Sequence, residues 1–258
     1  MIVIFFILGL IIGSFLNCLI WRVYKGESMW GFSHCLSCQK TIKWYDNIPV
    51  LSFFILRGKC RFCQAKIPWY YPVVELVTGL LFAGSFYYHA YVLDFNLFYL
   101  IFFLLVISFL IIFFVFDLRW FLVPVNLLIG GAVLIFFFQL YFNVSVLNIL
   151  ISVFLGAAFF ALQFFISRGK WIGEGDIWLG GFWGLVFAKP FLVLFFILLT
   201  YIIGGLVSII LIVSGYKKLG EKIPLGVFMS LAALIVLFFG EPLLSWYLGL
   251  FQIGRAHV

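Results

Sequence analysis

The sequence predicts an all-α integral membrane protein with about eight transmembrane helices and a cysteine-bearing cytoplasmic loop between the first two. Hydrophobic residues make up 66% of the 258 residues and charged residues only 10%, which is far from the make-up of soluble domains. Apolar windows of about 20 residues, enough to cross about 30 Å of hydrocarbon, recur along nearly the whole chain. Four cysteines in two close pairs lie in the polar segment that follows the first window.

Eight apolar segments are expected to be transmembrane helices. The first helix, at 1–21, precedes a polar loop at 22–71, and residues 72–253 hold the other seven helices. The sixth segment is short for a membrane span. The last five residues, 254–258, differ in composition from the rest and are expected to be an added tail. The apolar segments lie at 2–21, 72–88, 97–116, 123–142, 147–167, 177–188, 191–214 and 225–247.

Basic residues predict the orientation, because Lys and Arg near helix ends are retained on the cytoplasmic side. Eight of the 16 Lys and Arg residues lie in the first loop, and most of the others lie in alternate loops after it. Both termini are therefore expected outside, and the first loop in the cytoplasm. The net charge is +7, and the basic residues are spread over four short loops and do not form one basic stripe. This distribution favours membrane lipid as a partner and argues against nucleic acid.

The first loop contains two C-x-x-C pairs, CLSC at 35–38 and CRFC at 60–63. Two such pairs can close on one Zn²⁺ through four thiolates, and thiols stay reduced in the cytoplasm. We expect a structural, zinc-ribbon-like site whose metal folds a loop too small to bury a core. Two disulfides or four unrelated thiols are the alternatives, and a catalytic zinc is disfavoured because four cysteines leave no open position. The expected ligands are Cys35, Cys38, Cys60 and Cys63.

Two aspartates border apolar segments. Asp117 ends the third segment in FVFDLRW, and Asp176 opens the sixth in GEGDIWL, so both are expected at the cytoplasmic boundary. Two carboxylates at one depth can share a proton, one acting as general base toward water and the other as general acid. That is the chemistry of an aspartic protease. Gly173 and Gly175 are expected to permit unusual backbone angles and close approach of a substrate backbone.

Simpler interpretations of these acids stay open. Asp117 would pair with Arg119 or mark a helix end, and Asp176 would cap the sixth helix. Glu174 is expected to be a solvated neighbour, whereas Glu75, inside the second segment, is a candidate buried acid.

Four motifs in order resemble those of the prepilin peptidases, or type IV leader peptidases, which are GxGD membrane aspartic proteases of type IV pilus and type II secretion systems. GSFLNCLIWR at 13–22 resembles the first-helix motif, and the segment at 46–79, which ends in IPWYYPVVELVTG, resembles the cysteine-bearing segment. GEGD at 173–176 is similar to the G-x-G-D signature, and IPLGVFMSLAAL at 223–234 to the last-helix motif. The resemblance runs over most of the chain.

The resemblance implies that Asp117 and Asp176 are catalytic and that 72–253 form the aspartic peptidase domain. It implies a prepilin or pseudopilin precursor as substrate, cut beside its basic leader at the cytoplasmic face of the bacterial inner membrane. Many members are bifunctional and also N-methylate the new N-terminus with S-adenosylmethionine. No glycine-rich cofactor fingerprint appears here. Trp178 and Asn126 stand where the family often has a lysine and an acid, which leaves the methyltransferase function open.

Three other functions fit parts of the sequence. Another GxGD intramembrane protease would share the aspartates but not the cysteine loop. An ion- or proton-coupled membrane transporter would use Asp117 and Asp176 to bind or relay cations, although the third to sixth segments offer few polar residues for a path. A non-enzymatic scaffold would use the cysteine loop for docking.

Overall fold

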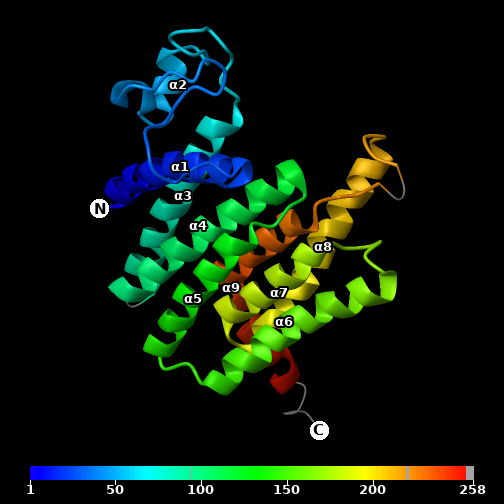
Figure 1. Ribbon diagram of the computed structural model, residues 1–258. Coiled ribbons are helices and arrows are strands. Elements are labelled where there is room, and N and C mark those ends of the chain that lie inside the picture. The colour runs from blue at the N-terminus through cyan, green and yellow to red at the C-terminus, as the bar shows by residue number, and fades with distance from the viewer. Residues whose placement is uncertain (94, 219–220, 254–258) are drawn as a thin grey trace. The chain divides into compact units, whose positions relative to one another are not determined.

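The computed structural model describes residues 1–93, 95–218 and 221–253, the side chains of 247–253 excepted. Asp94 and the expected tail at 254–258 lie outside this range. All eight predicted apolar segments form helices (Figure 1). The described residues form two isolated β-bridges and no strand. The helical elements are α1 (Ile2–Lys25), η1 (Trp44–Asn47), α2 (Leu51–Ile55), α3 (Tyr70–Tyr91), α4 (Leu97–Trp120), α5 (Val125–Tyr141), α6 (Val146–Ser167), α7 (Glu174–Phe187), α8 (Pro190–Val213) and α9 (Leu225–Ile253).

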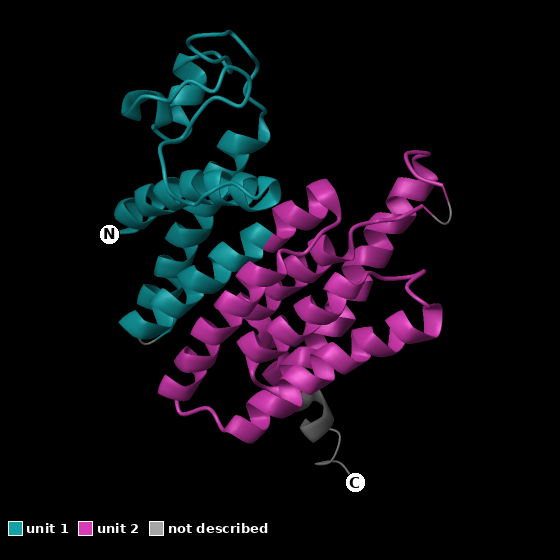
Figure 2. Cartoon of the chain, viewed as in Figure 1, with its two compact units in different colours: residues 1–112 teal, residues 113–258 magenta. Residues whose placement is uncertain are grey.

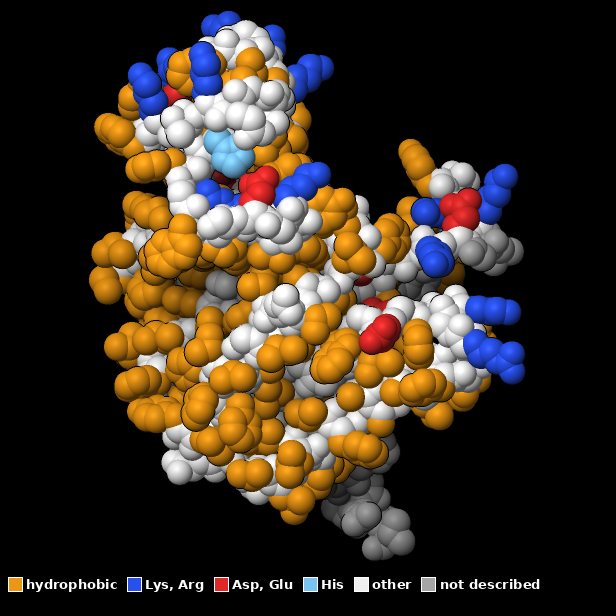
Figure 3. All heavy atoms as spheres, viewed as in Figure 1, with side chains coloured by type: hydrophobic (Ala, Val, Ile, Leu, Met, Phe, Trp, Pro, Cys, Tyr) orange, Lys and Arg blue, Asp and Glu red, His pale blue; other side chains and the backbone are white. Residues whose placement is uncertain are grey.

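Six of these helices are long and apolar enough to cross a bilayer: α1, α3, α4, α6, α8 and α9. The apolar helix α5 has 17 residues and α7 has 14, so both are shorter than a usual span. Hydrophobic side chains cover the helices, and Lys and Arg side chains gather at the loops (Figure 3). The chain is therefore a multi-pass membrane protein, as the composition predicts.

The chain forms two compact units, Met1–Ile112 and Phe113–Val258, so that α4 begins in the first and ends in the second (Figure 2). In unit 1, α1 packs closely against α3 through small residues. A Cβ atom on Gly9 would lie 2.7 Å from the Cα of Gly79, and one on Gly13 would lie 2.7 Å from the Cα of Glu75. Small residues let helix backbones approach in this way within membranes.

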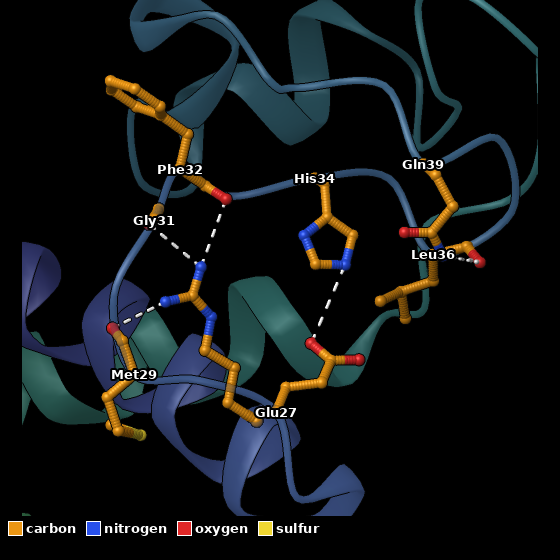
Figure 4. Close-up of polar contacts among 8 residues, drawn as sticks. Glu27, Met29, Gly31, Phe32, His34, Leu36 and Gln39 are labelled. Atoms are coloured by element: carbon orange, nitrogen blue, oxygen red, sulfur yellow. Dashed lines mark hydrogen bonds and ion pairs between the residues drawn. The ribbon is translucent and has the colours of Figure 1, made fainter.

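Residues 26–69, between α1 and α3, are called the cysteine loop below. The loop begins at Gly26, whose φ of 68° ends α1 in the left-handed conformation. Arg22, buried in the last turn of α1, donates to the carbonyl oxygens of Met29, Gly31 and Phe32 at 2.7, 3.0 and 3.1 Å (Figure 4). One guanidinium thus satisfies three backbone acceptors and fixes the path by which the loop leaves the helix.

In unit 2, the short helix α7 lies against α6 at near backbone contact. A Cβ on Gly156 of α6 would lie 2.2 Å from the carbonyl oxygen of Gly180, and one on Gly184 would lie 2.3 Å from that of Ser152. On another side of α7, the ring of Phe182 meets Phe113 edge to face, with centroids 5.0 Å apart. These contacts bury α7, which carries one of the two expected catalytic aspartates.

The far end of α7 is held by a side chain from α5. The buried amide of Gln139 donates to the carbonyl oxygens of Leu185 and Val186, at 3.0 and 2.7 Å. The last carbonyls of a helix have no partner within the helix, and leaving them unpaired in hydrocarbon costs several kcal/mol. Gln139 therefore lets α7 end after 14 residues without exposing its backbone to lipid.

Candidate active site and metal centre

Asp117 lies in the last turn of α4 and is only 7% exposed. Its Oδ2 accepts a hydrogen bond from the backbone N–H of Val227 at 3.0 Å. Val227 lies in the first turn of α9, where backbone N–H groups lack partners within the helix and the helix dipole favours a negative charge. The carboxylate is therefore hydrogen-bonded to the backbone of α9, 110 positions further along the chain.

Asp176 lies in the first turn of α7 and is 8% exposed. Its Oδ2 accepts the N–H of Gly173 at 2.9 Å, and Gly173 is the N-cap residue of α7. The interpretation of Asp176 as the cap itself is therefore corrected: it is the third helical residue, reaching back to the cap. Glu174 is exposed beside it, as expected.

Three helix ends meet around these acids. A Cβ on Gly226, at the start of α9, would lie 2.8 Å from Oδ2 of Asp117 and 3.0 Å from Cδ1 of Leu179, one turn beyond Asp176. The charge of Asp117 also acts directly on Asp176. The structure thus brings together two acids 59 positions apart, on α4 and α7, and the start of α9 contacts both helices and donates a backbone N–H to Asp117.

The glycines of the GEGD motif do not adopt the unusual backbone angles that were expected. Gly173 has an extended backbone with φ of −83°, which any residue adopts. Gly175 is needed for packing, because a Cβ there would lie 2.6 Å from Cγ2 of Val123, in the segment that joins α4 to α5. Its role is therefore to let the start of α7 lie against the segment that follows Asp117.

The two cysteine pairs form matching turns in the cysteine loop. The N–H of Cys35 donates to the carbonyl of Lys40 at 2.9 Å, and that of Cys60 donates to Ala65 at 2.9 Å. A glutamine with φ near 60° follows each pair, and an isolated β-bridge flanks each turn. The sulfur atoms of Cys35, Cys38, Cys60 and Cys63 all lie within 4.8 Å of one another.

This cluster has dimensions suited to a tetrahedral metal ion. Zn–S bonds of about 2.3 Å in a tetrahedron place neighbouring sulfur atoms about 3.8 Å apart. The sulfur atoms of Cys35 and Cys63 are 3.8 Å apart. The four thiols belong to free cysteines, so the disulfide alternative does not describe this structure. The cluster could hold a metal ion.

The thiols of the cluster differ in acidity. Burial acts to raise the pKa of the Cys35 thiol, but the backbone amides of Cys38 and Ser37 and nearby thiols donate to its sulfur and lower the pKa to about 7. At Cys63 the amide of Ala65 acts to lower the pKa, but desolvation and the other three cysteines raise it to about 11. Four thiols this close cannot all ionise without a cation among them.

Two further acids have structural partners that sequence patterns do not reveal. Glu75, buried in α3 as expected, accepts the N–H of Val50 through Oε2 at 2.7 Å. Asp46 accepts two hydrogen bonds from Arg61, at 2.8 and 2.5 Å, and these bonds hold the pKa of its carboxyl below the usual value. Both bonds fix the cysteine loop, and neither acid lies in unit 2 with the aspartate pair.

Comparisons with known proteins agree with this architecture. The Bacterial Peptidase A24 N-terminal domain matches residues 7–89, and the Type IV leader peptidase family matches 104–209. A Bacillus subtilis protein named prepilin leader peptidase/N-methyltransferase is 30% identical over 96% of this chain and 98% of its own length. The chain belongs to the type IV leader peptidase family.

Other members of the type IV leader peptidase family match over different lengths. A Legionella pneumophila prepilin leader peptidase/N-methyltransferase is 26% identical over 84% of this chain and 75% of its own. An Escherichia coli O78:H11 protein named type 4 prepilin-like proteins leader peptide-processing enzyme is 47% identical over 29% of this chain. That alignment spans only 35% of the Escherichia coli protein, and the next relative, from Myxococcus xanthus, is spanned over 23%. No solved structure matches the chain.

Proposed function

We propose that this protein is a membrane aspartic endopeptidase that removes the basic leader from a type IV prepilin or pseudopilin. The observation that carries the proposal is the pair of buried carboxylates, Asp117 and Asp176, brought together from α4 and α7. Buried acids beside membrane spans mark functional sites. Membership of the family and the names of the relatives support the same reaction. Residues 72–253 are proposed as its peptidase domain.

In this mechanism the two carboxylates hold one proton between them, because two negative charges this close in an apolar site repel. The ionised aspartate takes a proton from water, whose oxygen attacks the scissile carbonyl carbon. The protonated aspartate donates to the carbonyl oxygen. The first aspartate then passes the proton it took from water to the leaving amine as the C–N bond breaks, and a hydroxyl of the diol returns a proton to the second aspartate. The backbone N–H groups of Val227 and Gly173 orient the two carboxylates.

The proposed site lies at the cytoplasmic face of the bacterial inner membrane. Arg119 lies in the last turn of α4, and Arg168 and Lys170 follow α6 directly, in the segment that leads into α7. By the positive-inside rule these ends face the cytoplasm. A substrate with a basic leader in the cytoplasm and an apolar helix in the bilayer would present its junction at this depth.

Two cofactors belong to the proposal. The cysteine cluster would hold Zn²⁺ in a structural role, with four thiolates closing its coordination. S-adenosylmethionine would supply a methyl group for the new N-terminal amine. A cavity within unit 1 suits such a ligand: it is lined by Trp21, Arg22 and Glu75 among others, and the buried indole N–H of Trp21 has no partner within the described residues. The indole N–H would donate to an acceptor of the ligand, while Arg22 and Glu75, which already bind the loop backbone, would line the cavity with charge.

The test is cleavage of a precursor pilin peptide by the protein in detergent, with products read by mass. Asp117→Asn and Asp176→Asn should each abolish cleavage, since an amide can still accept the backbone bond but cannot act as acid or base. Glu174→Gln, beside Asp176 but exposed, is the matched control and should cleave normally. Added S-adenosylmethionine should increase the product mass by one methyl group.

Equal cleavage by all variants would contradict the catalytic roles of Asp117 and Asp176. No cleavage by the native protein would contradict the peptidase proposal and favour the transporter or scaffold. Melting curves of the two asparagine variants show whether a loss of cleavage comes from lost chemistry or from an unfolded protein. A variant that melts like the native protein but fails to cleave has lost chemistry and kept its fold.

A further inference from the structure

The cysteine loop exposes an apolar surface around its short helix α2. Phe53 is buried and packs on Trp69, with ring centroids 4.6 Å apart. Phe54 and Ile55 instead point outward, at 59% and 63% exposed, and Trp69 is 67% exposed. Together with Leu51, also exposed, these side chains form what we call the α2 surface, and Phe54 contacts Trp69 edge to face. Contiguous exposed apolar groups of this kind indicate a binding surface.

Two links hold the α2 surface at the depth where α3 enters the membrane. Trp69 directly precedes α3, which is one of the candidate spans. Glu75 lies five residues after the first residue of α3, about 7.5 Å along its axis. Its carboxylate accepts the N–H of Val50, the N-cap residue of α2. Helical side chains lean toward the N-terminus, so this bond keeps α2 level with the first two turns of the span.

The backbone of Val50 is strained to make this link. Its φ of 60° and ψ of −51° are rare for a β-branched residue. The bond to Glu75 is a contact with a buried carboxylate, which is among the stronger hydrogen bonds in proteins. The chain therefore maintains the position of α2 against the preference of its own backbone.

Charge beside the α2 surface matches a particular partner. Arg57 and Lys59 follow α2 directly and are exposed. Aromatic residues favour the bilayer interface, and basic residues next to it attract anionic headgroups. We propose that α2 is seated in the membrane interface, with Leu51, Phe54, Ile55 and Trp69 among the acyl chains and Arg57 and Lys59 on anionic lipid headgroups.

The proposal can be tested by photo-crosslinking of the full chain in lipid nanodiscs that contain phosphatidylglycerol and phosphatidylcholine. Phe54 is replaced by p-benzoylphenylalanine, which preserves an aromatic side chain, and lipid adducts are counted by mass. Phe62, also exposed but in the second cysteine turn beneath Lys40, is replaced in the matched control. Adducts at position 54 should exceed those at position 62 at least fivefold. Equal yields would overturn the proposal.

Two further arms decide the nature of the partner. Arg57→Gln with Lys59→Gln should reduce the adduct yield at position 54 severalfold, to the level found in discs of phosphatidylcholine alone. A yield unchanged by both substitutions would overturn the role of anionic lipid. Adducts that move from lipid to an added precursor peptide would show a substrate surface instead. Because crosslinking needs no catalysis, its outcome is independent of the proposed peptidase activity.

Discussion

Gly226→Ala perturbs the aspartate pair without changing either acid. The new methyl group would lie 2.8 Å from Oδ2 of Asp117, so the carboxylate must move by about 0.6 Å to reach the 3.4 Å of ordinary contact. It would also lie 3.0 Å from Leu179. Misplacement of a catalytic group by about 1 Å can cost a hundredfold in rate, so we expect kcat/KM to fall roughly 10- to 100-fold.

The same substitution should change stability much less. Overpacking costs about 1–3 kcal/mol, and alanine recovers up to about 1 kcal/mol relative to glycine in a helix. The assay is cleavage of the precursor peptide together with thermal unfolding in the same detergent. Gly205→Ala, in α8 with no atom within 4 Å of the added Cβ, is the control and should cleave normally. Normal cleavage by Gly226→Ala would refute the close contact between α9 and Asp117.

Three shorter predictions concern other parts of the chain. Gly175→Ala should slow cleavage because its Cβ would lie 2.6 Å from Val123, and adding Val123→Ala should restore the rate; a double variant as slow as the single one would contradict this packing. Val50→Gly should stabilise the cysteine loop by about 1 kcal/mol, because it relieves backbone strain of about 1–3 kcal/mol at an entropic cost of about 0.5–1 kcal/mol. Slower hydrogen exchange in the loop would show this gain. Val50→Ala, which keeps a Cβ atom at the same φ, should give no such gain. Metal removal by a chelator should unfold the cysteine loop, and elemental analysis of the untreated protein should find one ion per chain. Metal affinity should weaken as the pH falls below about 7, because the Cys35 thiol is then protonated. Binding that is independent of pH would argue against thiolate ligands.

The eight helices were predictable because hydrocarbon imposes a length and composition that a single sequence displays directly. The cysteine cluster was predictable for a similar reason, since the spacing of each pair alone suits a shared metal. Counting helices predicts only that Asp117 and Asp176 share a membrane face, because an even number of crossings between two residues returns the chain to the same side. The packing that holds them together did not follow from this count.

Contacts between distant positions were not predictable from local patterns. The hydrogen bond from Val50 to Glu75 depends on the path of the cysteine loop through space. The local sequence around Val50 does not indicate a positive φ at this valine. The packing contact of Gly175 was not predictable because its neighbour, Val123, lies 52 positions away in sequence. A glycine motif shows that space is needed but not which atoms occupy it.

The hydrogen bonds at both ends of α7 have a consequence for how the protein responds to its membrane. Gln139 holds the last turn of this helix, and Asp176 closes the first. Long helices adapt to a thicker or thinner bilayer by tilting. The 14-residue helix α7 is hydrogen-bonded at each end and packs closely against α6, so it need not tilt with them. Asp176 is then positioned by the protein's interior and not by the lipid, so the proposed active site would keep its geometry in bilayers of differing thickness.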